Sequence, residues 1–342
     1  FYVKTDSRFI QYPQYLSALK NVRIDLFNKG VILAICIYIG ALVSFWAYSN
    51  NKVNKNILSI IFLGLLFFDL WIINNEFLAL KSSRSMKKQF VIDPYISYLK
   101  KDKSRFRIYP VNEMTANRFG YWNIESVGGY RAVKLRNYQD LLSSKMISRP
   151  EVLNMLNVKY MLTNEKVTSK SFKQVVGLKN LYQNKDHLPR AWLVGNITNV
   201  INQKESFEKI SKISFNPKKH AVVLNYRGPD LSGITDGNIE IKSYSPNLIS
   251  LQAETKGGAL LVLSEIYYEP RWKCRIDGQS VPIYQTNHIL RSVYIPDGSH
   301  KVEFYYDSSD WKMAKVVSRF TFFSSILFLC LILYRENKIK IS

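Results

Sequence analysis

Three long apolar stretches dominate the hydropathy pattern of the chain. They run from Val31 to Tyr48, from Ile57 to Ile73 and from Val316 to Tyr334, and polar residues interrupt each of them rarely. A helix needs roughly 20 residues to cross the hydrocarbon layer, with a range of about 17 to 25. The pattern therefore predicts three transmembrane helices. Core helices of a soluble protein are the alternative, but three such runs seldom occur together in soluble domains.

Basic residues beside these stretches predict the orientation of the helices, because cytoplasmic loops are enriched in Lys and Arg. Such residues occupy the connection between the first two stretches and the tail behind the third: Lys52, Lys55, Arg335, Lys338 and Lys340. Both segments are therefore predicted to be cytoplasmic, and residues 81–312 to be extracytoplasmic. A basic cluster at residues 81–88 opposes this orientation, but long translocated segments obey the charge rule poorly.

The polar segment before the first stretch carries a helical pattern. Tyr15, Leu19, Val22 and Leu26 recur at intervals of three or four residues, with charged side chains beside them. This spacing is typical of an amphipathic helix at the membrane surface, or of the end of an earlier span. The chain begins at Phe1 without a signal-peptide pattern, so we expect it to be the C-terminal part of a longer protein.

Residues 81–186 alternate between helix and strand signals. Arg105 to Tyr109 alternates as a strand, and Tyr138 to Met146 has helical spacing. Pro150 stands where the first turn of a helix accepts proline, and Val158 to Thr163 is strand-like. This mixture predicts an extracytoplasmic α/β subdomain.

Short strands separated by turns follow from residue 187 to residue 312. Leu248 to Thr255 alternates between polar and apolar positions, and Ala259 to Ser264 is almost uniformly apolar. Strands this short and regularly punctuated are typical of an antiparallel β-sandwich. The predicted organisation is an interfacial helix with two transmembrane helices (1–80), the α/β subdomain (81–186), a C-terminal β-sandwich (187–312), and a final transmembrane helix with a cytoplasmic tail (313–342).

An aromatic and basic segment, YYEPRWKCRIDGQSVPI at residues 267–283, is either part of the core or a binding site. Its apolar positions alternate with charged ones, as in a half-buried antiparallel strand. Asp277-Gly278 suits a tight hairpin turn. We therefore interpret most of the segment as core. Lys273 and Arg275 fall on the outward face and are candidate contacts for an anionic polymer.

The net charge of +22 favours anionic partners. Nucleic acid is disfavoured for a segment that faces away from the cytoplasm, which leaves membrane lipid, polyprenyl phosphates and anionic cell-surface polymers. An evenly basic, solvated surface is the structural alternative. The three cysteines form no metal-binding pattern. No cofactor or metal site is predicted, and the need for a divalent cation stays open.

Asp69 is a carboxylate inside the second apolar stretch. An unpaired charge at that depth costs on the order of 3 kcal/mol. Glu76 follows seven residues later and falls on the same face of a helix. One hypothesis is that both line a polar cavity and hold a cation or a basic residue. The other is that Asp69 forms a structural ion pair with a neighbouring span.

The segment from residue 112 to residue 136 is dense in polar and aromatic side chains. Aromatic faces stack on sugars, and arginine forks bind phosphate. A loop of this composition could close a donor site over a membrane cavity, or it could be an ordinary interdomain loop. The candidate binding residues are Asn117, Arg118, Tyr121, Glu125, Tyr130, Arg131 and Arg136.

A series of short motifs runs through the chain in a fixed order. Near the C-terminus these are Tyr267, Tyr268, Pro270, Trp272, Asp277, Gly278, Val281, Pro282, Ile283, Pro296, Gly298, His300, Val302 and Phe304. Upstream lie FDLWIINNEFL (68–78), SVGGY (126–130), LNMLNVKYMLT (153–163) and LPRAWLV (188–194). The series resembles the bacterial YfhO-type membrane proteins, although Arg271 stands where that family usually has glycine.

The resemblance implies a large multi-span protein of the bacterial plasma membrane, similar to the GT-C glycosyltransferases. It implies transfer of a sugar from a polyprenyl-phosphate donor to a cell-surface polymer, such as a teichoic acid, on the outer face. The acidic catalytic residue of such enzymes usually lies in an early extracytoplasmic loop, so we expect it upstream of residue 1. The rival hypothesis is a non-catalytic, membrane-anchored β-sandwich module that binds or organises anionic surface polysaccharide.

Overall fold

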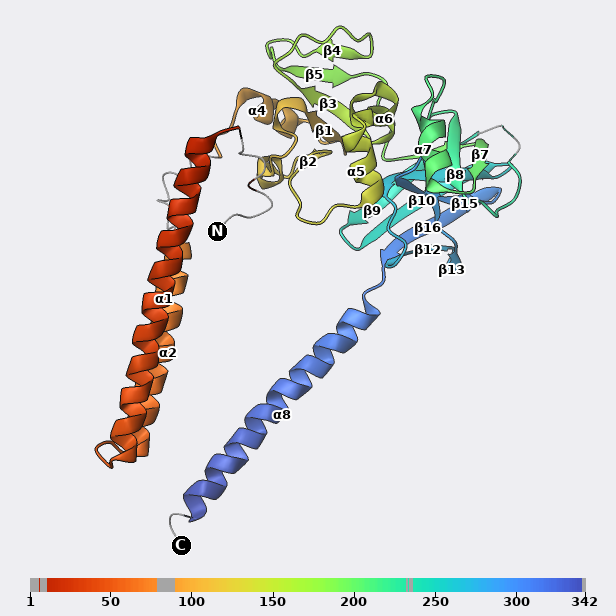
Figure 1. Cartoon of the computed structure of the whole chain (residues 1–342). Helices are drawn as coiled ribbons and strands as arrows, with labels where there is room; N and C mark the ends of the chain where they lie inside the picture. The colour runs from red at the N-terminus through yellow and green to blue at the C-terminus, as the bar shows by residue number, and fades with distance from the viewer. Residues whose placement is uncertain (1–5, 7–10, 79–89, 232, 234–235, 340–342) are drawn as a thin grey trace. The chain divides into compact units, whose positions relative to one another are not determined.

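The computed structural model describes residues 6, 11–78, 90–231, 233 and 236–339 of the 342 (Figure 1). The chain divides into two compact units, Phe1–Gln89 and Phe90–Ser342.

The first unit contains two long helices, α1 (Pro13–Ser49) and α2 (Lys55–Phe77), which pack along each other. The backbone N–H of Ile57 donates to the Asn54 side chain, at 2.9 Å, and so caps the start of α2. The predicted amphipathic helix and the first apolar stretch are one continuous helix, α1. Gly30 is the one residue between them that disfavours a helix, and a single glycine costs only about 1 kcal/mol.

Long apolar helices account for much of the exposed hydrophobic surface. Three helices of the described part of the chain are long and apolar enough to cross a membrane, over Pro13–Ser49, Lys55–Ile72 and Ser309–Arg335. The third belongs to α8 (Ser309–Ile339), on which Phe320 and Phe328 are 73% and 67% exposed. Water-facing apolar patches of this size are unusual in soluble monomers. The predicted number of candidate spans is confirmed.

The second unit begins with a mixed five-stranded sheet in the order β2-β1-β3-β5-β4. β1 pairs in parallel with β2 and β3, whereas β5 pairs antiparallel with β3 and β4. The strands are β1 (Arg107–Pro110), β2 (Glu125–Ser126), β3 (Val158–Leu162), β4 (Phe172–Gln174) and β5 (Leu181–Asn184). The accompanying helices are α4 (Pro94–Lys101), η2 (Val111–Glu113), η3 (Arg118–Trp122), α5 (Arg136–Ser143), η4 (Met146–Ser148) and α6 (Pro150–Met155).

Two further sheets follow, and the short helix α7 (Gln203–Ser211) lies between β7 and β8 in the chain. The six-stranded sheet has the order β6-β11-β15-β14-β8-β7, formed by Ala191–Val194, Ala259–Ile266, Leu290–Ile295, Tyr284–Thr286, His220–Leu224 and Asn196–Val200. The five-stranded sheet has the order β13-β12-β16-β10-β9, formed by Gln279–Val281, Trp272–Ile276, Gly298–Tyr306, Leu248–Lys256 and Asp236–Ser245. The five-stranded sheet is antiparallel throughout, as predicted, whereas β7 and β8 of the six-stranded sheet are parallel.

The six-stranded sheet contributes to a hydrophobic core on each of its faces. Leu261 and Leu263 of β11 join Ile249 and Phe304 of the five-stranded sheet in one core. Leu260 and Val262, which alternate with them, belong to a second core that also contains residues of α5 and α6. This double coverage explains why Ala259 to Ser264 is buried without interruption. Residues on both sides of the predicted boundary at 186/187 share the second core.

The strand that begins at Trp272 matches its prediction closely. Cys274 and Ile276 are buried, the charged residues between them are exposed, and Asp277 and Gly278 have the positive φ angles of a tight turn. After the turn, the returning segment divides at Pro282 into β13 and β14, because proline has no N–H to donate to a strand ladder. Tyr306 is 36% exposed at the end of β16.

Replacing Phe304 by alanine tests the core between these two sheets. Phe304 is fully buried, so Phe304→Ala should lower the free energy of unfolding of residues 90–307 by about 3–5 kcal/mol. Thermal or denaturant unfolding of the full chain in detergent measures this loss. The matched control is Phe320→Ala on α8, which removes an exposed ring and should leave that transition unchanged. Equal effects of both variants would contradict the assignment of Phe304 to the core.

Candidate functional site

Asp69 lies on the apolar helix α2 and is partly exposed. It forms no ion pair with any residue inside the described ranges. The backbone of α2 continues through Glu76, but the Glu76 side chain lies outside the described residues. The predicted pairing of the two carboxylates on one face therefore stays a prediction.

Asn117 closes the base of the candidate loop. Its side-chain oxygen accepts the N–H of Tyr130 at 2.8 Å, and its amide nitrogen donates to the Tyr130 carbonyl at 3.1 Å. The loop also folds tightly at Gly128, where a Cβ atom would lie 2.6 Å from the Met114 carbonyl oxygen. Asn117 therefore has a structural role, because both polar atoms of its side chain are bonded to the backbone of Tyr130.

Arg118 is similarly occupied. Its guanidinium binds both carboxylate oxygens of Glu113, at 2.6 and 2.8 Å, and donates to Asp93 at 3.1 Å and to the Tyr95 hydroxyl. Hydrogen bonding to Glu113, followed by the nearby charges, raises the pKa of Arg118, so the side chain stays protonated. A guanidinium with this many protein acceptors has little capacity left for a phosphate.

Glu125 belongs to a group of charged side chains that we call the arginine–glutamate cluster. Its members come from strands of all three sheets or from residues next to them: Arg105, Arg107, Glu125, Arg190, Tyr244 and Glu265. Arg190 is almost fully buried and lies 2.7 Å from Glu125 and 3.2 Å from Glu265. Arg107 reaches Glu265 at 2.7 Å and also donates to the Ser264 carbonyl. The cluster therefore ties the mixed sheet to the two sheets that follow.

Glu265 is the centre of the cluster's electrostatics. Burial by itself would raise the pKa of this carboxyl, but the charges of Arg107 and Arg190 and the Tyr244 hydroxyl outweigh that effect, and the net shift is downward. Glu265 is therefore ionised at neutral pH. Since Arg107, Arg190 and Tyr244 all donate to its Oε1 atom, the cluster is suited to holding strands together.

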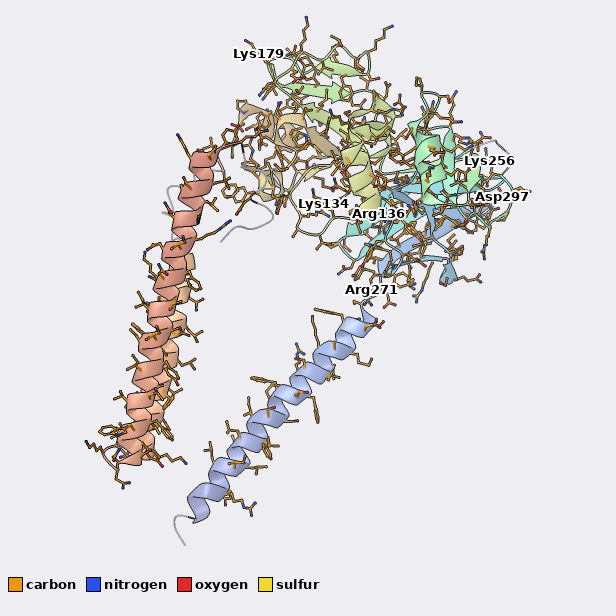
Figure 2. The ribbon with its side chains drawn as sticks, viewed as in Figure 1. Lys134, Arg136, Lys179, Lys256, Arg271 and Asp297 are labelled. Atoms are coloured by element: carbon orange, nitrogen blue, oxygen red, sulfur yellow. The ribbon has the colours of Figure 1, made fainter. Side chains whose placement is uncertain are left out.

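The remaining candidates of the loop face solvent. Tyr121 is 64% exposed and stacks on Phe90, and Tyr130 is 65% exposed. Arg131 and Arg136 are also exposed, and Figure 2 shows Arg136 close to Lys134 on the surface of the second unit. These four candidates are accessible to a ligand, whereas Asn117, Arg118 and Glu125 form internal contacts.

A pocket of about 350 Å³ opens beside β12, and we call it the β12 pocket. Its lining residues come mainly from the aromatic and basic segment singled out in the sequence: Tyr267, Tyr268, Glu269, Trp272, Lys273, Ser280, Val281, Pro282, Ile283 and Arg291. Lys273 is therefore part of a concave site. Arg275 points elsewhere, with its guanidinium 4.6 Å from the centre of the Tyr305 ring.

The β12 pocket lies where α8 leaves the sheets. Trp272 pairs with Tyr306, the last residue of β16, and α8 begins three residues later at Ser309. Arg271, labelled in Figure 2, binds Asp310 in the first turn of α8 at 2.9 Å. A candidate membrane span thus starts immediately beside the pocket.

Arg291 is the lining residue that the sequence analysis missed. It stands on β15 between Leu290 and Ser292 and is only 3% exposed. The one available signal was a charged residue in the otherwise apolar pattern LRSVYI. The other lining residues belong to the continuous segment 267–283, which the sequence analysis singled out. The sequence gives no sign that Arg291 on β15 lies against Trp272 on β12.

The described residues contain no group of three or more His, Cys, Asp or Glu side chains placed to hold a metal ion. The chain matches no protein-family model, no curated protein and no solved structure. The resemblance to the YfhO-type proteins accordingly stays a prediction from the motifs.

Removing the charge of Glu265 tests the arginine–glutamate cluster. Glu265→Gln leaves Arg107 and Arg190 without that carboxylate, so we expect a loss of about 3 kcal/mol in the free energy of unfolding at pH 7. The matched control, Glu240→Gln, breaks an exposed pair with Lys242 and should cost less than about 0.5 kcal/mol.

The pH dependence of unfolding gives a second measure of the same contact. Because folding lowers the pKa of Glu265, its contribution is complete above the ordinary value of 4.5 and is lost as the pH falls through the lower, folded pKa. Below pH 4.5, Glu265→Gln should therefore lose less of its free energy of unfolding on acidification than the wild type. Parallel pH profiles for the two proteins would contradict the assignment.

Proposed function

We propose that the chain is the C-terminal part of an integral membrane protein of the bacterial plasma membrane that handles sugars for the cell envelope. In this proposal the three apolar helices span the membrane and residues 81–312 lie on the outer face. The two sheets that share a core form the predicted β-sandwich. The reaction is transfer of a sugar from polyprenyl phosphate to a surface polymer such as a teichoic acid.

The observation that carries the proposal is the position and lining of the β12 pocket. Aromatic rings of Tyr267, Tyr268 and Trp272 offer flat apolar faces of the kind on which sugar rings stack. Lys273 adds a positive charge, and α8 begins within a few residues of the pocket. A sugar attached to a membrane lipid needs both features, because its carrier holds it at the bilayer surface.

The transfer reaction itself is inferred from the resemblance to GT-C-like proteins, with the catalytic acid expected upstream. Within the present chain, Asp69 is the candidate for a role inside the membrane. Its carboxylate would attract a cation or a basic side chain of the remaining spans, since an isolated charge in hydrocarbon is costly.

A non-catalytic binding module is the second candidate function. It is favoured by the internal contacts of the loop, in which Asn117, Arg118 and Glu125 brace the fold. In that case the β12 pocket and the exposed residues Tyr130 and Arg131 would bind or organise an anionic surface polysaccharide, and the chain would transfer nothing.

Cysteine labelling tests the proposed orientation. Lys242→Cys on β9 should react with a membrane-impermeant maleimide in intact spheroplasts, whereas Lys55→Cys at the start of α2 should react only after permeabilisation. Both positions are at exposed residues. The natural cysteine of the sheets, Cys274, is buried and gives little background. The reverse labelling pattern would invert the orientation and remove the outer-face chemistry.

A complementation assay tests the proposed transfer. Cells that lack the protein should lose sugar from their surface polymer, and the wild-type chain in its full-length context should restore it. Asp69→Asn should restore less than a tenth of the wild-type content, because it removes the intramembrane charge. Asp25→Asn on α1, where Asp25 forms an exposed pair with Lys29, is the matched control and should restore it fully.

Two results of this assay would contradict the proposal. Unchanged surface sugar in cells without the protein would exclude glycosyl transfer and favour the binding module. Full membrane assembly and full transfer by Asp69→Asn would remove the functional role of Asp69.

A further inference from the structure

Arg291 is a buried cation whose hydrogen-bonding capacity is largely unused. Its Nη2 group donates to the Ile266 carbonyl at 2.8 Å, but Nε and Nη1 have no hydrogen-bond partner among the described residues. The side chain is 3% exposed and lines the β12 pocket. Buried donors without acceptors cost about 1–3 kcal/mol each, so such an arrangement calls for a ligand or a function.

The charge of Arg291 is also incompletely compensated. Burial lowers its pKa to about 10, against the opposing attraction of Glu265. Glu265 itself is bound by Arg107 and Arg190 and makes no ion pair with Arg291 within 4 Å. An anion in the pocket would supply the missing negative charge.

We propose that the β12 pocket binds a phosphate group, with the free Nε and Nη1 groups of Arg291 as its principal donors and Lys273 as a second cation. A guanidinium presents adjacent N–H groups that match two oxygens of one phosphate. The proposal deepens the proposed function, on which it rests for the membrane location of the pocket.

Trp272 stacks on the face of the Arg291 guanidinium. Its ring lies 4.2 Å from the Arg291 guanidinium and is itself only partly buried. The free Nε and Nη1 groups are shielded from solvent, so phosphate binding requires a shift of the side chains around them. Tyr267 and Tyr268 also line the pocket, and the Glu269 carboxylate can accept hydrogen bonds from hydroxyl groups of the remainder of the ligand.

The start of α8 favours a phosphate carried by a lipid. Trp311 is 66% exposed in the first turn, and Lys312 and Lys315 follow it. Trp is enriched where a span crosses the head-group layer, and Lys side chains near the end of a span extend into that layer. The pocket, which is joined to this turn through Arg271 and Asp310, would then lie at the level of lipid phosphates.

Binding to the full chain in micelles of a polyoxyethylene detergent, which contains neither phosphate nor sugar, tests the inference. The probes are dodecyl phosphate, inorganic phosphate and, as an uncharged control, dodecyl glucoside. The wild type should show saturable binding of dodecyl phosphate by calorimetry and a concentration-dependent rise in melting temperature. Saturation by inorganic phosphate as well would assign the site to phosphate itself, whereas binding of dodecyl phosphate alone would assign it to a lipid phosphate.

Pocket variants connect this binding to the proposed donors. Arg291→Lys keeps a positive charge but loses the fork of N–H groups, and it should weaken binding of dodecyl phosphate at least tenfold. Lys273→Gln, at an exposed position, should weaken it about threefold. Lys242→Gln removes an equivalent lysine charge from β9, at the other edge of the same sheet, and should leave the affinity unchanged.

Several outcomes would overturn the proposal. These are the absence of saturable binding by either phosphate probe, equal loss of affinity in Lys242→Gln and Lys273→Gln, or unchanged affinity in Arg291→Lys. If Arg291→Lys does not fold, Lys273→Gln decides, and unchanged affinity in that variant counts against the site. Failed phosphate binding alongside normal complementation would remove only this inference, whereas phosphate binding without a change in surface sugar would remove the proposed transfer.

Discussion

Burial of the six-stranded sheet on both faces is the constraint on which the second unit depends. Alternate side chains of β11 enter different cores, one shared with the five-stranded sheet and one shared with α5 and α6. Apolar burial on two sides makes β11 and β15 central to the unit, because the two cores that join the sheets both include their side chains. A polar residue buried in these strands therefore needs a hydrogen-bond partner from the protein or from a ligand.

The arginine–glutamate cluster and Arg291 show two outcomes of that constraint. Arg107 and Arg190 are buried beside the carboxylates of Glu125 and Glu265, so their charges are neutralised within the protein. Arg291 stands on the neighbouring strand and has free donors in a pocket. Buried arginines thus hold the sheets together at the arginine–glutamate cluster, whereas Arg291 keeps donors without protein partners near the start of α8.

Much of the fold could be predicted from the sequence because its signals are local. The three apolar stretches, the alternation around Cys274 and the Asp277-Gly278 turn each depend on neighbouring residues, and each appears as expected. The site was less predictable, since it depends on contacts between distant segments. Arg118 was a ligand candidate by composition, but Glu113 and Asp93 occupy it. Arg291 reaches the β12 pocket only because the six-stranded sheet packs on the five-stranded sheet.

The short connection from β16 to α8 has a mechanical consequence. Only Asp307 and Ser308 separate the strand from the helix, so the Cα atoms of Tyr306 and Ser309 are about 10 Å apart at most. β16 is flanked on both sides, by β10 and β12, in antiparallel ladders. Tension applied through the helix along the strand would load these rows of hydrogen bonds together in shear, so both ladders would resist the extraction of β16 by a pull on α8.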